Sequence, residues 1–217
     1  MASNLGYRLV AILAADGVEY SRLMARDAGD TLAALDAARA VFASHVAEHR
    51  GRITDTAGDS ILAVFGTASG AVQAALVIQR DLATSAVGRP RERVLRYRIG
   101  MHLGDVIEKS DGSVYGNGVN VAARVQALAK PGAIAVSDIL RGALGEAWPH
   151  LRFEDQGMHQ VRNIAQPVHV FGLSIVTRRC RRRLFDDGHQ DGGRLLEQSR
   201  ERLMLAAEAL SPIGSGP

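Results

Sequence analysis

Residues 52–65 constrain the fold more than any other stretch, because they form two apolar segments separated by a short polar turn. Ile53 leads into the turn, and the apolar run at residues 61–65 leads out of it. Gly58 adopts positive φ at little cost and Asp59 tolerates a tight turn, so the stretch predicts a β-hairpin. Asp59 then either caps the turn through local hydrogen bonds, as turn aspartates usually do, or points from the tip into a cleft.

Strands and helices are predicted on both sides of this hairpin from the period of the apolar residues. Strands are predicted over residues 7–15, 94–102, 104–108, 133–136, 151–156 and 168–176. Helices are predicted over residues 21–50, 68–82, 119–128 and 137–144. Asp16 and Gly17 are expected to end the first strand, and Ser137 to cap the last helix. His102 follows a strand and is expected to be a structural residue of the core.

Size and charge favour one main domain with an appendage. The 217 residues, 47% of them hydrophobic, are enough to bury a core. Lys and Arg number 26 against 23 Asp and Glu, and much of the excess lies in an arginine run at residues 178–183. The near-neutral remainder argues against broad nucleic-acid binding. The single cysteine, Cys180, fits a reducing compartment, and the apolar run at residues 9–15 is too short to span a membrane, so we expect a cytoplasmic protein.

The chain is predicted to divide into a main domain, residues 1–176, and a basic linker with a C-terminal amphipathic helix, residues 177–217. Leu195, Leu196, Leu203 and Ala206 recur at helical spacing within the second part. We interpret this part as a flexible extension whose helix binds a partner. The alternative is that its arginine run forms a site for nucleic acid or anionic lipid.

Two carboxylates follow predicted strands and are candidates for metal binding. Asp16 follows the first strand and Asp59 lies at the hairpin tip, so the two converge if these strands are neighbours. Paired carboxylates suit Mg²⁺, which prefers oxygen ligands and is commonly completed by substrate phosphates. Asn120 and Arg124 are four residues apart on a predicted helix and share a face. That face is either simply exposed to solvent or part of a site, in which Asn120 would orient a hydroxyl and Arg124 would neutralise the charge on a phosphoryl group.

Four motifs together resemble the catalytic domain of class III nucleotidyl cyclases, most closely the bacterial adenylate cyclase type. They are VAILAADGVEYSRLM at residues 10–24, Gly58-Asp59-Ser60, RIGMHLGD at residues 98–105 and VYGNGVNVAAR at residues 114–124. The resemblance covers residues 7–173. It implies an α+β fold with a ferredoxin-like β-α-β-β-α-β core, an antiparallel-rich central sheet and flanking helices. It also implies a head-to-tail homodimer with active sites at the interface.

The resemblance assigns roles to particular positions. Asp16 and Asp59 match the two metal-binding aspartates, which implies two Mg²⁺ or Mn²⁺ ions in each active site. Asn120 and Arg124 match the pair that orients the ribose and stabilises the transition state from the opposite subunit. Arg162 matches a basic residue near the triphosphate. The implied reaction is attack of the ribose 3′-hydroxyl on the α-phosphate of a nucleoside triphosphate, which releases pyrophosphate.

Three positions depart from the family pattern. Asp55 and Ser113 stand where the family reads adenine with Lys and with Asp or Thr. Because a carboxylate only accepts hydrogen bonds and an ammonium only donates them, Asp55 reverses the polarity at the first position. Asp55 can accept from the amine of adenine or from the N–H groups of guanine, or it can be a solvent-facing strand residue. Glu19 stands where the family commonly has Gly, and its carboxylate is expected either to contact metal or to clash.

The function predicted from the sequence is therefore an adenylate cyclase that converts ATP to 3′,5′-cyclic AMP and pyrophosphate by two-metal catalysis at a homodimer interface. One alternative is a degenerate cyclase-homology module that binds nucleotide or a partner without turnover. The other is a guanylate cyclase, which differs only in the base that it selects.

Overall fold

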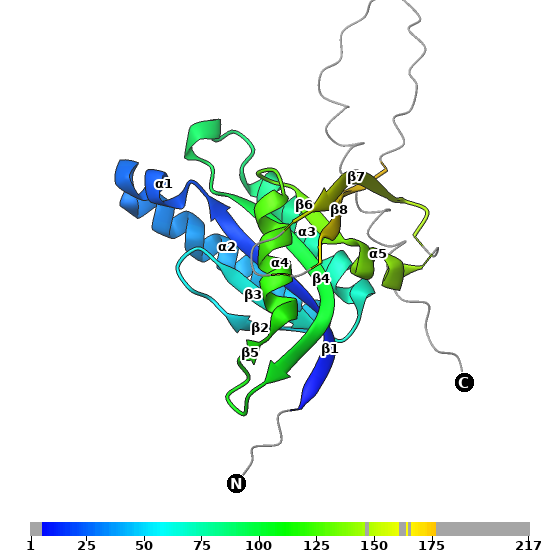
Figure 1. Cartoon of the computed structure of the whole chain (residues 1–217). Coiled ribbons are helices and arrows are strands. Elements are labelled where there is room, and N and C mark those ends of the chain that lie inside the picture. Colours follow the sequence, from blue (N-terminus) through cyan, green and yellow to red (C-terminus); the bar gives the residue numbers. More distant parts are fainter. Residues whose placement is uncertain (1–5, 146–147, 161–163, 165, 177–217) are drawn as a thin grey trace, which may run out of the picture. The chain divides into compact units, whose positions relative to one another are not determined.

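The structure is a computed structural model that describes residues 6–145, 148–160, 164 and 166–176 (Figure 1). The strands are β1 (Tyr7–Val18), β2 (Gly51–Asp55), β3 (Ile61–Phe65), β4 (Arg96–Glu108), β5 (Val114–Tyr115), β6 (Ile134–Ser137), β7 (Leu151–His159) and β8 (Val168–Ile175). The helices are α1 (Tyr20–Arg26), α2 (Ala28–Glu48), α3 (Ala68–Ser85), α4 (Asn117–Leu128) and α5 (Asp138–Leu144), with a 3₁₀ turn at Arg91–Arg93. The predicted arginine run and C-terminal helix, within residues 177–217, lie outside the described residues.

The strands form one mixed sheet in the order β2-β3-β1-β4-β6-β8-β7, with β5 paired to β4. All neighbouring strands are antiparallel except β4 and β6, which run parallel. The first four strands, with α2 between β1 and β2 and α3 between β3 and β4, reproduce the order of a ferredoxin-like β-α-β-β-α-β core. The predicted α+β fold is therefore confirmed, including the hairpin of β2 and β3.

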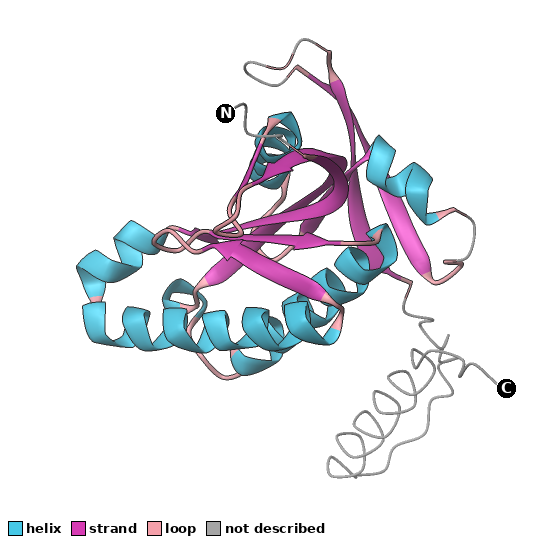
Figure 2. Ribbon diagram, turned by 90° about the horizontal axis from the view of Figure 1, so that it is seen from below, coloured by secondary structure: helices cyan, strands magenta, loops and turns pink. Residues whose placement is uncertain are grey.

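Helices cover both faces of the sheet (Figure 2). The alternation of residues in β1 decides which face each side chain meets. Ala11, Leu13 and Ala15 belong to the large core that α2, α3 and α5 cover. Val10, Ile12 and Ala14 belong to a second core on the opposite face. Helix α4 contributes Ala122 to this second core and lies across β1 and β4 in Figure 1. Because both faces of β1 are buried, the strand reads as the continuous apolar run seen in the sequence.

Close packing of α4 on the sheet depends on a missing side chain at Gly100 in β4. A Cβ at this position would lie 2.0 Å from the backbone nitrogen of Gln126 and 2.3 Å from its Cα. No side chain fits into that space without moving the helix, so this glycine is required for the approach of two backbone segments. It thereby fixes the distance between α4 and the strands that carry the candidate site.

Several boundaries differ from the prediction, and two of these differences lie near the candidate site. The first strand does not end at Asp16 but runs on to Val18, because β4 pairs with it as far as the Val18–Arg96 pair. The predicted helix starting at residue 21 is divided at Asp27, whose backbone is extended and whose Oδ1 accepts the Asp30 N–H at 3.0 Å. Asp27 therefore caps α2 as a new helix. No helix in the described part of the chain is long and apolar enough to cross a membrane.

His102 is confirmed as a structural core residue and makes the stability of the fold dependent on pH. It is 7% exposed, its Nδ1 lies 2.9 Å from Ser137 Oγ, and burial lowers its pKa from 6.5 to about 4, with Asp138 acting weakly in the opposite direction. Between these two pH values the unfolded chain binds the extra proton and the folded chain does not. Acidification from pH 7 to pH 5 is therefore expected to lower the free energy of unfolding by about 2 kcal/mol through this residue.

Urea unfolding of the wild-type protein and of His102→Gln at the two pH values measures this contribution. The wild-type protein is expected to lose more stability than the variant on acidification, because the remaining histidines are common to both. An equal loss in the two proteins would contradict the assignment.

Candidate active site

Asp16 lies within β1 and is held by two side chains from neighbouring strands. Ser60, next to β3, donates its hydroxyl to Asp16 Oδ1 at 3.0 Å. Arg98, opposite Asp16 in β4, donates from Nη2 to Asp16 Oδ2 at 3.1 Å. The Asp16 side chain is 31% exposed, so its carboxylate stays accessible while both oxygens are oriented.

Asp59 lies in the turn between β2 and β3, as predicted. Gly58 has φ of 60°, and the Ser60 N–H donates to the Ala57 carbonyl at 2.9 Å to close the turn. The Asp59 carboxylate packs against Gly17, since a Cβ on that glycine would lie 2.9 Å from Asp59 Oδ2. Gly17 follows Asp16 directly and has no side chain. The Asp59 carboxylate occupies the space that a side chain at this position would fill.

The two carboxylates are close enough to interact. Burial raises the pKa of Asp59, and the negative charge of Asp16 raises it further, while backbone hydrogen bonds and the Arg98 guanidinium act in the opposite direction. The structure thus brings together Asp16 and Asp59, which are 43 positions apart in the chain. Two like charges at one site favour a bound cation, and carboxylate oxygens are the ligands that Mg²⁺ prefers.

A cavity of about 210 Å³ opens beside Asp16, between the hairpin and α4. Asp55 and Ser60 line the side that the hairpin provides. The opposite side is formed by three residues of α4, which are Val119, Ala123 and Gln126. Asp55 is exposed at the end of β2, and its side chain has no hydrogen-bond or ion-pair partner among the described residues. Its carboxylate is therefore free to accept from a ligand in this cavity.

Asn120 and Arg124 lie on α4 but not on the face that lines this cavity. Both are exposed, and they stand one position further round the helix than Val119 and Ala123. One copy of the chain therefore does not bring this pair to the cavity beside Asp16. The predicted sharing of one helical face by Asn120 and Arg124 agrees with their positions in α4.

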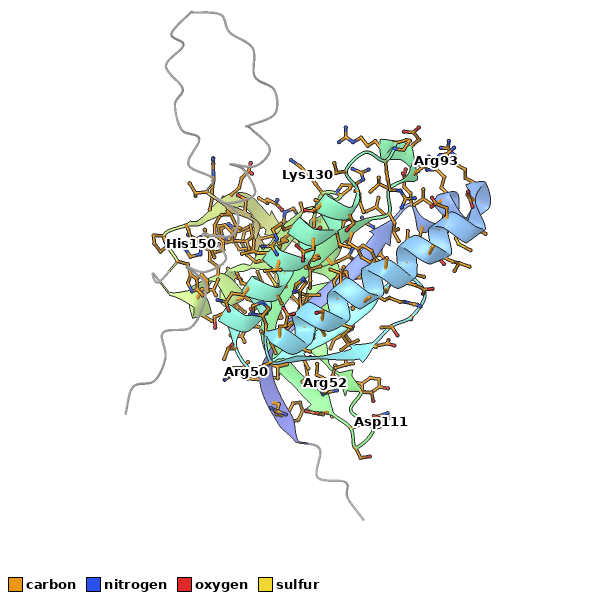
Figure 3. The ribbon with its side chains drawn as sticks, turned by 180° about the vertical axis from the view of Figure 1, so that it is seen from behind. Arg50, Arg52, Arg93, Asp111, Lys130 and His150 are labelled. Atoms are coloured by element: carbon orange, nitrogen blue, oxygen red, sulfur yellow. The ribbon has the colours of Figure 1, made fainter. Side chains whose placement is uncertain are left out.

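Ser113 and Arg162 are the remaining predicted site residues. Ser113 lies in the loop between β4 and β5, where its hydroxyl and its N–H both donate to Asp111 Oδ1, the N–H at 2.9 Å. The same loop is held by Arg52, which donates to the Gly112 carbonyl; Arg52 and Asp111 lie at the same end of the sheet in Figure 3. Ser113 does not line the cavity beside Asp16. Arg162 lies outside the described residues.

Glu19 occupies a backbone position that suits glycine. It is the residue before α1 and has φ of 60°, in the left-handed region that costs an L-residue about 1 kcal/mol. Its carboxylate forms an exposed ion pair with Arg22 at 2.5 Å. The Glu19 carboxylate is thus paired with a residue of α1. This pairing explains how the chain tolerates a carboxylate at a position where a clash with the site is one of the two expectations.

Replacing Glu19 with glycine is expected to raise the free energy of unfolding by up to about 1 kcal/mol, because glycine adopts this backbone without strain. Urea unfolding measures the gain, and Glu19→Gln, which keeps the strain and removes the charge, is the matched control. We expect Glu19→Gln to unfold at the same urea concentration as the wild-type protein. An equal gain of stability in both variants would show that the charge of Glu19, and not its backbone strain, is unfavourable.

Arg98 and Ser60 are site residues that sequence reasoning did not single out. In residues 94–102 apolar residues alternate with Arg96, Arg98 and Gly100, and this alternation is the signal in the sequence that puts Arg98 on the polar face of its strand. The alternation does not identify Asp16 as the ion-pair partner of Arg98, because the two residues are 82 positions apart in the chain. Only the register of β1 on β4 puts the guanidinium on this carboxylate.

Comparison with known proteins agrees with this geometry. The family described as "Adenylate and Guanylate cyclase catalytic domain" matches residues 4–173. A Rhizobium meliloti (strain 1021) protein named "Putative adenylate cyclase 3" is 42% identical over 168 residues, which are 77% of this chain and 28% of that protein. A Glutamicibacter nicotianae protein named "Adenylate cyclase" is 34% identical over 132 residues, which are 60% of this chain and 31% of that protein. The chain thus spans under a third of the length of these curated relatives.

Solved structures share the fold. A crystal structure named adenylate/guanylate cyclase/hydrolase from Silicibacter pomeroyi superposes with a TM-score of 0.70 at 37% identity, covering 79% of this chain and 99% of that one. An adenylate cyclase from Trypanosoma brucei superposes with a TM-score of 0.67 at 20% identity, covering 80% of this chain and 91% of that one. The resemblance seen in the motifs is therefore confirmed over the main domain. The chain belongs to the family of adenylate and guanylate cyclase catalytic domains.

Proposed function

We propose that this domain is an adenylate cyclase, which converts ATP to 3′,5′-cyclic AMP and pyrophosphate at the interface of a head-to-tail homodimer. The observation that carries the proposal is the convergence of Asp16 and Asp59 beside a cavity that also contains Asp55. The names of the two curated relatives support ATP as the substrate. We take residues 1–176 as the catalytic domain, residues 177–217 as a linker and partner-binding helix, and the cytoplasm as the compartment.

The site fits divalent cations. Within the described part of the chain, no third carboxylate, histidine or cysteine joins Asp16 and Asp59 in a cluster that could hold a metal by itself. Two carboxylates are enough for Mg²⁺ or Mn²⁺, because water molecules and substrate phosphates supply the remaining ligands of such ions. Two such ions, when bound, activate an attacking oxygen and stabilise a leaving one. Arg98, already paired with Asp16, adds a fixed positive charge beside the carboxylates, which suits an anionic triphosphate.

The other groups of the reaction come from α4 of a second copy. Asn120 holds the ribose so that its 3′-hydroxyl oxygen lies in line with the α-phosphorus, and Arg124 neutralises the charge that develops on the phosphoryl oxygens. A bond forms between the 3′-oxygen and the α-phosphorus, and the bond from that phosphorus to the bridging oxygen breaks. Pyrophosphate leaves with the electron pair, and the hydroxyl proton is released to water. The exposure of Asn120 and Arg124 in one copy supports this division of labour between subunits.

Guanylate cyclase is the second candidate, and Asp55 is the observation that favours it. A carboxylate can accept two hydrogen bonds from the ring N–H and the amine of guanine, but only one group of adenine, its amine, donates. Asp55 lies in the cavity with its carboxylate available, whereas the hydroxyl of Ser113 is donated to Asp111. The base selected therefore depends on Asp55 more than on Ser113.

Product identification after incubation with ATP or with GTP, in Mg²⁺ or Mn²⁺, tests the proposal. Cyclic AMP is the expected product. Formation of cyclic GMP from GTP, without cyclic AMP from ATP, would identify the domain as a guanylate cyclase. Calorimetric binding of nucleotide without any cyclic product in either metal would instead identify a module that binds without turnover. That result would overturn the proposed activity.

A further inference from the structure

Arg39 of α2 reaches across to the turn that carries Asp59. Its Nη2 donates to the Gly58 carbonyl at 2.7 Å, a contact between residues 19 positions apart. The same guanidinium has Asp36 at 3.8 Å on its own helix, and its Nε is buried with no hydrogen-bond partner. The Arg39 side chain thus links α2 to the hairpin tip. Helix α2 lies on the face of the sheet that is turned toward the viewer in Figure 3.

The Gly58 carbonyl belongs to the peptide group that joins Gly58 to Asp59. The turn around it contains one backbone hydrogen bond, from the Ser60 N–H to the Ala57 carbonyl. Residues 55–58 are exposed, and Gly58 is the residue type with the widest choice of backbone angles. The Asp59 carboxylate at the far end of the side chain packs against Gly17. The bond from Arg39 holds the other end, because it fixes the orientation of the peptide group from which the Asp59 side chain projects.

We infer that Arg39 is a positioning residue for Asp59, which fixes the hairpin tip so that this carboxylate meets Asp16 in the geometry that metal binding requires. The inference rests on the proposed function. Arg39 acts through the backbone of the turn rather than through its charge, because the charges that affect Asp59 most are those of Asp16 and Arg98. A displacement of about 1 Å at a reacting group can lower the rate by about a hundredfold, so a loosened turn has a measurable effect.

The test compares Arg39→Met, which keeps the length of the side chain and removes the donor, with Arg39→Lys, which retains one donor. Arg89→Met is the matched control, because Arg89 is similarly exposed, 36% against 38%, and also links distant segments through its bond to Asp30. The readouts are hydrogen exchange of residues 57–60, calorimetric binding of Mn²⁺ with 3′-deoxy-ATP, which cannot cyclise, and the Mn²⁺ dependence of turnover.

Arg39→Met is expected to show faster exchange at the turn, about tenfold weaker binding of the Mn²⁺ complex and a turnover number lowered by about ten- to a hundredfold. Arg39→Lys is expected to recover part of each effect, and Arg89→Met to behave as the wild-type protein. Unchanged Mn²⁺ binding in Arg39→Met would overturn the inference even where exchange is faster. If the wild-type protein binds no Mn²⁺ complex and forms no product, the proposed function fails instead, and the inference fails with it.

Discussion

Replacing Asp59 with alanine is expected to lower the turnover of ATP by about a thousandfold or more while the domain stays folded. The carboxylate is one of two that converge at the site, so its loss leaves Asp16 alone of the two proposed acidic ligands. The fold does not depend on it, because Asp59 lies in an exposed turn whose closing bond joins the backbone of Ala57 and Ser60. Turnover is measured as cyclic AMP formed at saturating Mg²⁺ and ATP.

A second measurement separates loss of the metal from loss of the fold. A ligand that binds only the folded protein raises its apparent stability, so Mg²⁺ with 3′-deoxy-ATP is expected to raise the melting temperature of the wild-type protein but not of Asp59→Ala. The two proteins are expected to melt at similar temperatures without ligand, since the variant removes a partly buried charge and no core contact. Turnover equal to that of the wild-type protein would contradict the role of Asp59.

The parts of the site that the sequence predicts are those encoded locally. The hairpin around Asp59 is one example, because Gly58 and the apolar segments on each side specify a turn within a few residues. The shared face of Asn120 and Arg124 is another, since it follows from the helical repeat alone. Both features needed only the spacing of neighbouring residues.

The parts that the sequence does not predict depend on contacts between distant segments. The ion pair of Arg98 with Asp16 requires the register of β1 on β4, and the bond of Arg39 to Gly58 requires the packing of α2 beside the hairpin. The extension of β1 to Val18 has the same cause, because pairing with β4 overrides the local tendency of Asp16 and Gly17 to end a strand. The strained backbone of Glu19 is a local feature, but the sequence does not show it, because it depends on where α1 begins.

Mixing two inactive variants, Asp59→Ala and Arg124→Ala, is expected to restore about a quarter of the wild-type activity, because random exchange of subunits in a twofold dimer makes about half of the dimers mixed. In a mixed dimer, one site combines both substitutions. The other combines the intact Asp59 of one copy with the intact Arg124 of its partner. Each variant alone is expected to be inactive, because every site in its homodimers lacks one of the two residues.

The restored activity is a test of the dimer that single substitutions cannot give. If Asp59 and Arg124 acted within one copy, every site in the mixture would lack one of them and no activity would return. The exposed position of Arg124, away from the cavity beside Asp16, is the reason to expect the first result. Asp16→Ala mixed with Asp59→Ala is the matched control, since both aspartates serve the same subunit's half of the site and the mixture is expected to stay inactive. Activity in that control would place the two aspartates in different halves and contradict their convergence in one chain.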